Sequence, residues 1–313
     1  MKSAGDTNQE QRICTKETIA PLVSKHAMNL SGSLNIKDSQ VWLLGILAGL
    51  TAIYLTLVWR SDNSDLFGNS LLFIAAIASL IKEKAPFHSL KSNSIASIVG
   101  TTLLAFLLIR SLGISSNSFL LAFPAIAGVG LALVASGVSG LSKFRQEILI
   151  LVFLGFPRLL LPIFIDPTAL TAKFSALVLW YMGFEVARNG YQIQIGDSAV
   201  EVFPGCSGIE SICYLLSLAG LFIMMFPLRR IEKVGVAVLA IAIAFIVNGF
   251  RVALLAHLVA ASLPEAFEYW HEGNGSFIFS MISVAILGLF CWLLLRQKNA
   301  QPYLEELNVQ EYD

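Results

Sequence analysis

The chain has 313 residues, of which 56% are apolar and only 13% are charged. Soluble domains carry roughly 25% charged residues, so this composition excludes an ordinary soluble domain and indicates an integral membrane protein. The formal net charge is zero, with 21 Lys and Arg against 21 Asp and Glu, which gives no electrostatic reason to expect nucleic acid as a partner.

A polar segment comes first. Residues 1–40 contain scattered Ser, Asn, Asp and Lys and lack the apolar core of a cleaved secretory signal. We interpret them as a cytoplasmic tail that precedes a multi-span membrane domain at residues 41–296. Residues 297–313 are then a second cytoplasmic tail.

Nine apolar runs follow the first tail, most of them near the roughly 20 residues with which a helix crosses a bilayer. They are residues 41–59, 66–81, 95–112, 118–139, 146–165, 168–187, 206–226, 234–256 and 276–295. Nine crossings would place the two termini on opposite sides of the membrane, whereas eight would place them on the same side.

Basic residues decide which runs cross, because they accumulate on the cytoplasmic side. If run 168–187 does not span, both termini are cytoplasmic, and 15 of the 21 basic residues lie on that side. The remaining six are Arg60, Arg110, Arg158, Lys173, Arg188 and Arg251. If all nine runs span, this asymmetry disappears. The sequence therefore predicts an all-α polytopic fold with about eight transmembrane helices.

The segment 168–205 is then an excursion at the outer face. Its first part, 168–187, is apolar and contains Trp180 and Tyr181, aromatic residues that are typical of membrane interfaces. This pattern predicts a helix that lies in the outer leaflet or dips into it.

The second part of the excursion changes its period. Apolar and polar residues alternate over 191–195 and again over 200–202, with a turn at Gly196-Asp197. We therefore expect a small extracytoplasmic β-hairpin that leads into Cys206.

Three motifs contain most of the reactive side chains: PGCSGIES with Cys206, NGFRVALLAH with Arg251, and WHEGNGS with His271. Cys206 starts the sixth crossing at its outer end. Arg251 lies nearly one membrane thickness beyond the basic loop 229–233, and His271 closes the outer loop 257–275. The topology thus predicts that the three side chains gather at one membrane face, where a thiol, a guanidinium and an imidazole together would suit acyl transfer.

A cysteine in an apolar helix is usually only a small buried residue. We interpret three of the four in that way: Cys14, Cys213 and Cys291. Cys206 differs in its position, because a helix N-terminus favours the thiolate, the form that attacks carbonyls. The backbone N–H groups of Ser207 and Gly208 beside the sulfur could form an oxyanion site.

We interpret Arg251 as a functional residue. An arginine on the membrane side of a helix end has a high free-energy cost unless its side chain snorkels to the interface or pairs with another group. Its planar guanidinium suits a carboxylate or an oxyanion. Asn248 lies one helical turn earlier on the same face and could orient the guanidinium or a substrate amide.

Two histidines compete for the role of the base. His257 does not share the helical face of Arg251, whereas His271 lies in a Gly-rich outer loop between Trp270 and Glu272. A histidine at an aqueous membrane edge is often only solvated, so position alone leaves this choice open. His26 and His88 fall on the cytoplasmic side. No pair of His or Cys has a spacing that suits a shared metal ion, and we expect neither a metal nor a cofactor.

The motifs PGCSGIES and NGFR, followed by His271 in an eight-span protein, resemble those of the exosortase/archaeosortase family. The hallmark of that family is a Cys in a C-S-G-[IL] context, an Arg in an N-x-x-R context and a downstream His. The resemblance covers about residues 145–295 and is greatest to the cyanobacterial branch, while residues 1–140 match only in hydropathy. One departure is Pro204-Gly205 before the cysteine, where many relatives have Ala.

The resemblance implies a membrane cysteine protease or transpeptidase of the plasma (inner) membrane with its site on the extracytoplasmic side. Its partners would be membrane lipid and exported proteins that carry a C-terminal sorting signal: a Pro-Glu-Pro-type motif, a transmembrane helix and a basic cluster. Carried over to this chain, Cys206 is the nucleophile, Arg251 stabilises the oxyanion or substrate, and His271 is the general acid and base.

Two other classes of function stay open at this point. A transporter or a lipid-linked glycan-handling protein could use an outer-face arginine to bind an anion, although the spans lack intramembrane acidic residues and an evident inverted repeat. A catalytically silent scaffold that packs against other membrane proteins is the third interpretation.

Overall fold

A computed structural model describes residues 39–84, 93–113 and 116–310. The predicted tail of residues 1–40 lies outside these ranges except for its last two residues, as do Cys14, His26 and His88. The chain divides into two units, residues 1–44 and 45–313. The fold and the site described below belong to the second unit.

Eight of the described helices are long and apolar enough to cross a membrane. They are α2 (Ser39–Arg60), α3 (Ser64–Lys84), α4 (Ser94–Ser111), α5 (Asn117–Ser136), α7 (Arg145–Phe164), α9 (Ile209–Met225), α10 (Arg230–Ala260) and α12 (Asn274–Gln310). These helices coincide with the eight predicted crossings, which confirms the all-α polytopic fold. Helix α12 runs well past the predicted end of its crossing and into residues 297–310, which were expected to be tail.

The apolar run 168–187, the sixth in chain order, forms α8 (Thr168–Tyr181), which is not among the eight candidate spans. Its 14 residues extend about 21 Å, less than the roughly 30 Å of a hydrocarbon core. The carboxylate of Asp166 accepts hydrogen bonds from the backbone N–H and the hydroxyl of Thr168 at the start of the helix. These bonds hold the pKa of the Asp166 carboxyl below its usual range. At the other end, Trp180 and Tyr181 are exposed, in agreement with an interfacial helix.

The run 168–187 is not helical throughout. Its last residues begin strand β1 (Val186–Asn189), which pairs antiparallel with β2 (Gln192–Ile195), and β2 pairs antiparallel with β3 (Ser198–Glu201). The predicted hairpin is therefore the second half of a three-stranded sheet. The first turn was missed in the sequence, although Asn189-Gly190 is a frequent hairpin signal and Gly190 has φ +61°.

Two short helices were also not expected. Helix α6 (Val138–Lys143) follows Gly137, and α11 (Pro264–His271) lies in the middle of the predicted outer loop 257–275. Pro264 at the first helical position of α11 favours a helix start there. His271 is thus the last residue of a helix and not part of a loop.

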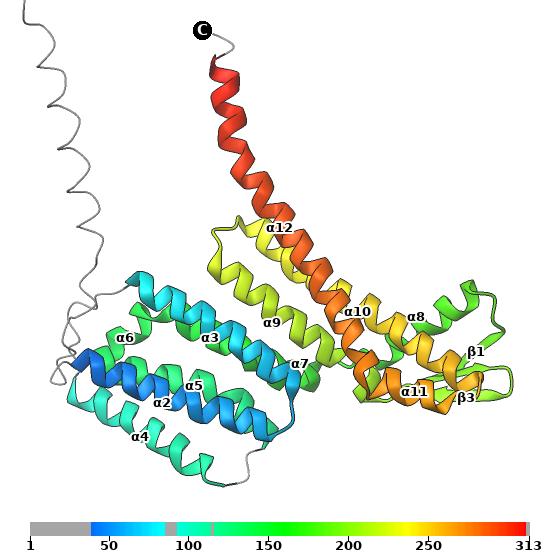
Figure 1. Cartoon of the computed structure of the whole chain (residues 1–313), viewed down its shortest axis with the longest axis horizontal. Coiled ribbons are helices and arrows are strands. Elements are labelled where there is room, and N and C mark those ends of the chain that lie inside the picture. Colours follow the sequence, from blue (N-terminus) through cyan, green and yellow to red (C-terminus); the bar gives the residue numbers. More distant parts are fainter. Residues whose placement is uncertain (1–38, 85–92, 114–115, 311–313) are drawn as a thin grey trace, which may run out of the picture. The chain divides into compact units, whose positions relative to one another are not determined.

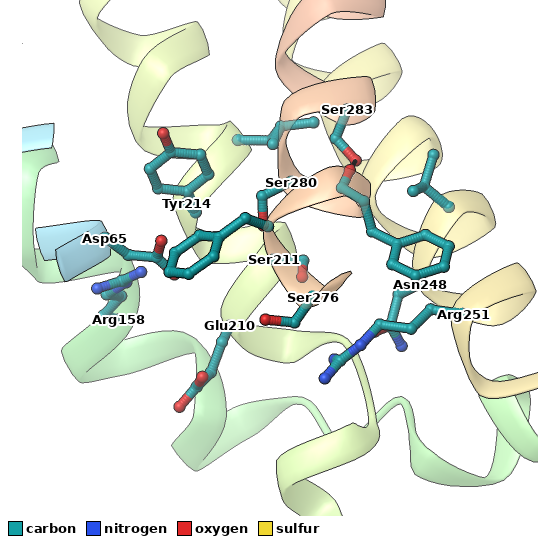
Figure 2. Close-up of a pocket in the computed structure, with 14 residues that line it drawn as sticks. Asp65, Arg158, Glu210, Ser211, Tyr214, Asn248, Arg251, Ser276, Ser280 and Ser283 are labelled. Carbon is teal, nitrogen blue, oxygen red and sulfur yellow. Dashed lines mark hydrogen bonds between the residues drawn. The ribbon is translucent and has the colours of Figure 1, made fainter. Parts of the chain in front are cut away.

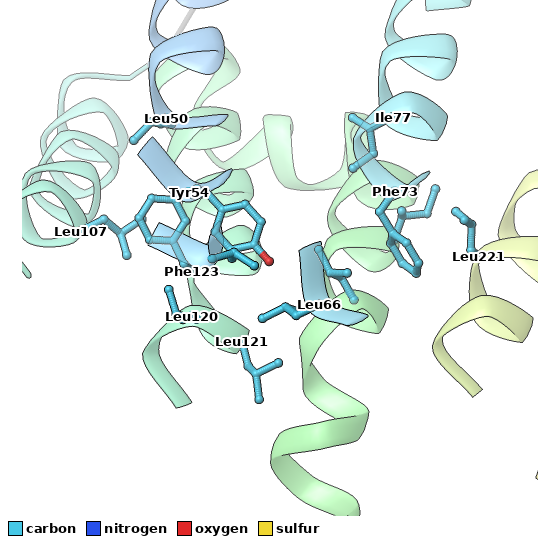
Figure 3. Packing of buried hydrophobic residues seen from close by; sticks show 14 of the residues in the cluster. Leu50, Tyr54, Leu66, Phe73, Ile77, Leu107, Leu120, Leu121, Phe123 and Leu221 are labelled. Carbon is cyan, nitrogen blue, oxygen red and sulfur yellow. The ribbon is translucent and has the colours of Figure 1, made fainter. Parts of the chain in front are cut away.

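Helices α2 to α5, together with α7, enclose the largest apolar cluster of the described residues. Figure 3 shows Tyr54 and Phe123 at its centre, and their rings stack with centroids 5.4 Å apart. Helices α5 and α7 approach closely at Gly155, where a Cβ would lie only 1.9 Å from the carbonyl oxygen of Leu121. This region is held together mainly by close van der Waals packing.

Helix α10 organises the remainder of the fold. Its middle packs against α9 and α12, and its end packs against α8, α11 and the sheet. Figure 1 shows α8, α11 and the three strands gathered near the end of α10. Ile193 and Ile195 of β2 are buried in a cluster with α8 and α10. The sheet therefore fixes the direction in which the chain enters Cys206.

Candidate active site

Cys206 is the last residue of a 3₁₀ turn, η1 (Pro204–Cys206), and α9 begins only at Ile209. Cys206 thus lies three residues before α9, while it stands near the start of the candidate span Pro204–Met225, as the sequence predicts. Pro204 and Gly205 form this turn: the N–H of Cys206 donates to Phe203 O at 2.9 Å, and that of Ser207 to Pro204 O at 3.2 Å.

Gly208 reverses the chain after the cysteine. It has φ +87°, and a Cβ at this position would lie 2.6 Å from Nδ2 of Asn248. The same amide nitrogen donates a hydrogen bond to the backbone carbonyl of Cys206 at 3.0 Å. Asn248 therefore holds the backbone of the Cys-Ser-Gly turn. Among the described residues it makes no hydrogen bond with the guanidinium of Arg251, and its expected contact with a substrate amide stays a prediction.

Helix α8 fixes the same turn from its other side. The hydroxyl of Thr171, which is fully buried, donates to the carbonyl of Ser207 at 2.7 Å. One turn further along α8, the hydroxyl of Ser175 donates to Gly249 O of α10 at 2.8 Å. Neither residue was among the predicted site residues. Their signal was the i, i+4 spacing of two hydroxyls on one face of a largely apolar helix.

His271 reaches the cysteine from α11. Its Nε2 lies 3.4 Å from Sγ of Cys206, and its ring stacks on Phe267 with centroids 5.0 Å apart. On the opposite side of the imidazole, Nδ1 lies 3.6 Å from a carboxylate oxygen of Glu272. An Nδ1–H that faces the carboxylate leaves Nε2 free to accept the thiol proton.

Arg251 completes the group from α10. Its Nη2 donates to the backbone carbonyl of His271 at 2.8 Å, while its buried Nε has no partner among the described residues. The guanidinium therefore anchors the end of α11 and keeps further donors for a ligand. The three predicted residues come from three separate elements and meet at one end of the helices.

The predicted oxyanion site is only partly available. The N–H of Ser207 is already bonded to Pro204 O, and its hydroxyl donates to the same carbonyl at 2.6 Å. The N–H of Gly208 has no hydrogen-bond partner within the described ranges. Gly208 and Arg251 are therefore the groups that remain to receive a developing negative charge.

The competing residues are placed elsewhere. The ring of His257 packs on Phe184 with centroids 4.8 Å apart, and the hydrogen bonds of the described residues join Cys206 Sγ to His271 and not to His257. Cys213 is fully buried, and its thiol donates to Pro157 O. Cys291 is buried in the cluster formed by α9, α10 and α12. In the described part of the chain, no three His, Cys, Asp or Glu side chains are placed to share a metal ion.

The sequence also matches a known protein family. The family model of the transmembrane exosortases matches residues 58–288. The match covers more than half of the chain, includes Cys206, Arg251 and His271, and extends further toward the N-terminus than the motifs indicate. The chain belongs to the transmembrane exosortase family. No curated protein and no solved structure matches it.

Proposed function

We propose that this exosortase-family protein is a cysteine protease or transpeptidase that cleaves the C-terminal sorting signal of exported proteins. The observation that carries the proposal is the 3.4 Å contact between the Cys206 thiol and Nε2 of His271. A nucleophile and a base within hydrogen-bonding reach, with a third group beside the base, is the arrangement that activates a thiol. Here Glu272 is that third group.

In the proposed reaction, His271 takes the thiol proton and Cys206 attacks the scissile carbonyl. The tetrahedral oxyanion is stabilised by the N–H of Gly208 and the guanidinium of Arg251. The imidazolium of His271 then donates its proton to the leaving amine, which departs with the transmembrane tail of the substrate. Water or a second nucleophile resolves the thioester that remains on Cys206 and regenerates the thiol.

The position of the site supports a substrate that is itself held in the membrane. Cys206 lies near one end of the candidate span Pro204–Met225, and the neighbouring α8 has the length and exposed aromatic residues of an interfacial helix. A substrate helix could enter from the lipid while its cleavage motif rests at the membrane surface. On the positive-inside argument, that surface is the extracytoplasmic one of the plasma (inner) membrane.

The test is co-expression of this protein with an exported protein that carries a Pro-Glu-Pro-type motif, a transmembrane helix and a basic cluster. Wild type should convert the substrate to a shorter form that has lost the transmembrane tail. The Cys206→Ala variant should leave the substrate at full length, and Cys291→Ala should process it normally. Conversion by Cys206→Ala would contradict the proposal.

A further inference from the structure

Beside the candidate active site lies a cavity of about 170 Å³ between α3, α7, α9, α10 and α12. Asn248 and Arg251 line it, so it is continuous with the groups that hold Cys206 and His271. Its opposite side is formed by Arg158 of α7, and Figure 2 shows Arg158 and Arg251 on the two sides of the cavity with Ser211 and Ser276 between them.

Arg158 has no role in the reaction proposed above. It lies less than two turns from the end of α7, inside a candidate membrane span. No hydrogen bond or ion pair to the guanidinium is found within the described residues, and its only close aromatic neighbour there is Tyr214, whose ring centroid is 5.9 Å away. A half-buried, unpaired arginine in a membrane span has a high free-energy cost. Its presence therefore indicates a functional contact.

The carboxylates of the cavity form no ion pair with Arg158 among the described residues, although Asp65 lies beside it in Figure 2. Asp65 and Glu210 also line the cavity, but both are exposed, and neither is within 4.0 Å of a basic nitrogen among the described residues. Exposed carboxylates can be solvated by water, whereas a half-buried guanidinium gains more from a fixed partner. The rest of the lining offers hydroxyls, including those of Tyr214, Ser276 and Ser280.

We infer that this cavity binds an acidic side chain of the substrate, with Arg158 as the residue that selects it. The inference rests on the proposed peptide-cleaving function, since a peptide substrate presents its anionic groups as carboxylates. A carboxylate fits the fork of a guanidinium in a two-bond geometry. Because the cavity adjoins Asn248 and Arg251, the acidic residue lies within a few residues of the scissile bond. Arg158 is therefore a specificity-determining residue.

Binding to an inactive enzyme tests the inference separately from catalysis. The protein is purified in detergent as the Cys206→Ala variant, and two fluorophore-labelled sorting-signal peptides are titrated, identical except for one Glu or one Gln beside the cleavage position. We expect the Glu peptide to bind about tenfold more tightly, and Arg158→Gln to abolish the difference. Arg158→Lys should keep part of it, because the charge remains but the fork does not.

The matched control is Asp65→Asn, which should keep the preference for the Glu peptide. If Asp65→Asn abolishes the preference as Arg158→Gln does, the two residues form a structural pair and the inference is wrong. Equal binding of the two peptides to the Cys206→Ala protein also overturns it, even where the wild type still cleaves substrates. If Arg158→Gln weakens only the binding of phosphatidylglycerol micelles, the cavity takes a lipid phosphate instead.

Discussion

Helices α2 to α5 and the end of the molecule formed by α8 to α11 are held together in different ways. In α2 to α5, side-chain hydroxyls mostly bond within their own helix, as Thr51 does to Leu47 O at 2.8 Å, and apolar packing joins one helix to the next. At the candidate site, hydrogen bonds connect residues that are far apart in the sequence, such as Thr171 with Ser207 and Asn248 with Cys206.

The difference has a physical reason. Apolar packing is non-directional, so it tolerates small shifts of one helix against another, whereas a thiol and an imidazole react only at a defined distance and angle. Directional hydrogen bonds in a poorly solvated region supply that precision. We therefore expect substitutions in α2 to α5 to change stability, and substitutions around Cys206 to change the activity of each folded molecule.

The largest loss of activity should come from Cys206→Ser. The hydroxyl is nearly isosteric but ionises far less readily than a thiol, so activity should fall by a factor on the order of 10³ or more while the protein still accumulates in the membrane. Cleavage of a co-expressed substrate and immunoblots of the membrane fraction measure the two effects. Cys213→Ser, at a buried cysteine away from His271, is the control, and its activity per folded molecule should be nearly normal.

The two histidines provide the next comparison. His271→Ala removes the group that contacts the thiol and should lower activity by roughly 10² to 10⁴. His257→Ala alters a ring that packs on Phe184 and should leave activity per folded molecule largely intact. Cleavage rates of the two purified variants decide between them. A large loss confined to His257→Ala would show that the base has been assigned to the wrong histidine.

Gly208→Ala should have a smaller effect, through geometry alone. The new Cβ strains a backbone with positive φ and meets the side chain of Asn248. This strain should lower stability by about 1–3 kcal/mol. It also displaces Cys206, so activity should fall about tenfold. Gly205→Ala is the matched control, because no atom lies within 4 Å of a Cβ there. Thermal unfolding and cleavage rates measure both effects, and equal behaviour of the two variants would refute this account of the turn.

Two threonines allow a direct comparison of a hydrogen bond between separate elements with a hydrogen bond inside one helix. Thr171→Val removes the bond to Ser207 O and should lower stability by about 1 kcal/mol, with activity reduced a few-fold. Thr51→Val removes only a bond within α2, where the carbonyl of Leu47 still has its helical partner, so stability and activity should barely change. If the two variants have the same cleavage rate, the contact between α8 and the turn does not matter for catalysis.

The smallest effect on activity per folded molecule should follow Leu120→Ala, although its effect on stability is large. Leu120 is almost fully buried in the apolar cluster of α2 to α5, and the cavity left by the change should lower stability by about 2–5 kcal/mol. The yield of folded protein should fall while the cleavage rate of the remaining folded protein stays the same. A matching fall in that rate would show that the two regions are coupled.

The sequence by itself determined the membrane class, the eight crossings and the end of the bundle at which Cys206, Arg251 and His271 lie. Hydropathy and the distribution of basic residues are local properties that the chain carries regardless of its partners. The short apolar helix α8 followed from the same properties, although its end at Tyr181 and the strand β1 did not, because a short strand forms only when a neighbour supplies its hydrogen bonds.

Only the tertiary structure decided how the site is assembled. The sequence placed three residues at one depth but did not show that His271 contacts Cys206 or that Arg251 binds the carbonyl of His271. It did not indicate a role for Thr171, and it predicted neither the hydrogen bond from Asn248 to the Cys206 carbonyl nor the cavity beside Arg158. These features depend on side chains from separate helices meeting in three dimensions, and the hydrophobic pattern of a single helix fixes which face is buried, not which polar group that face will meet.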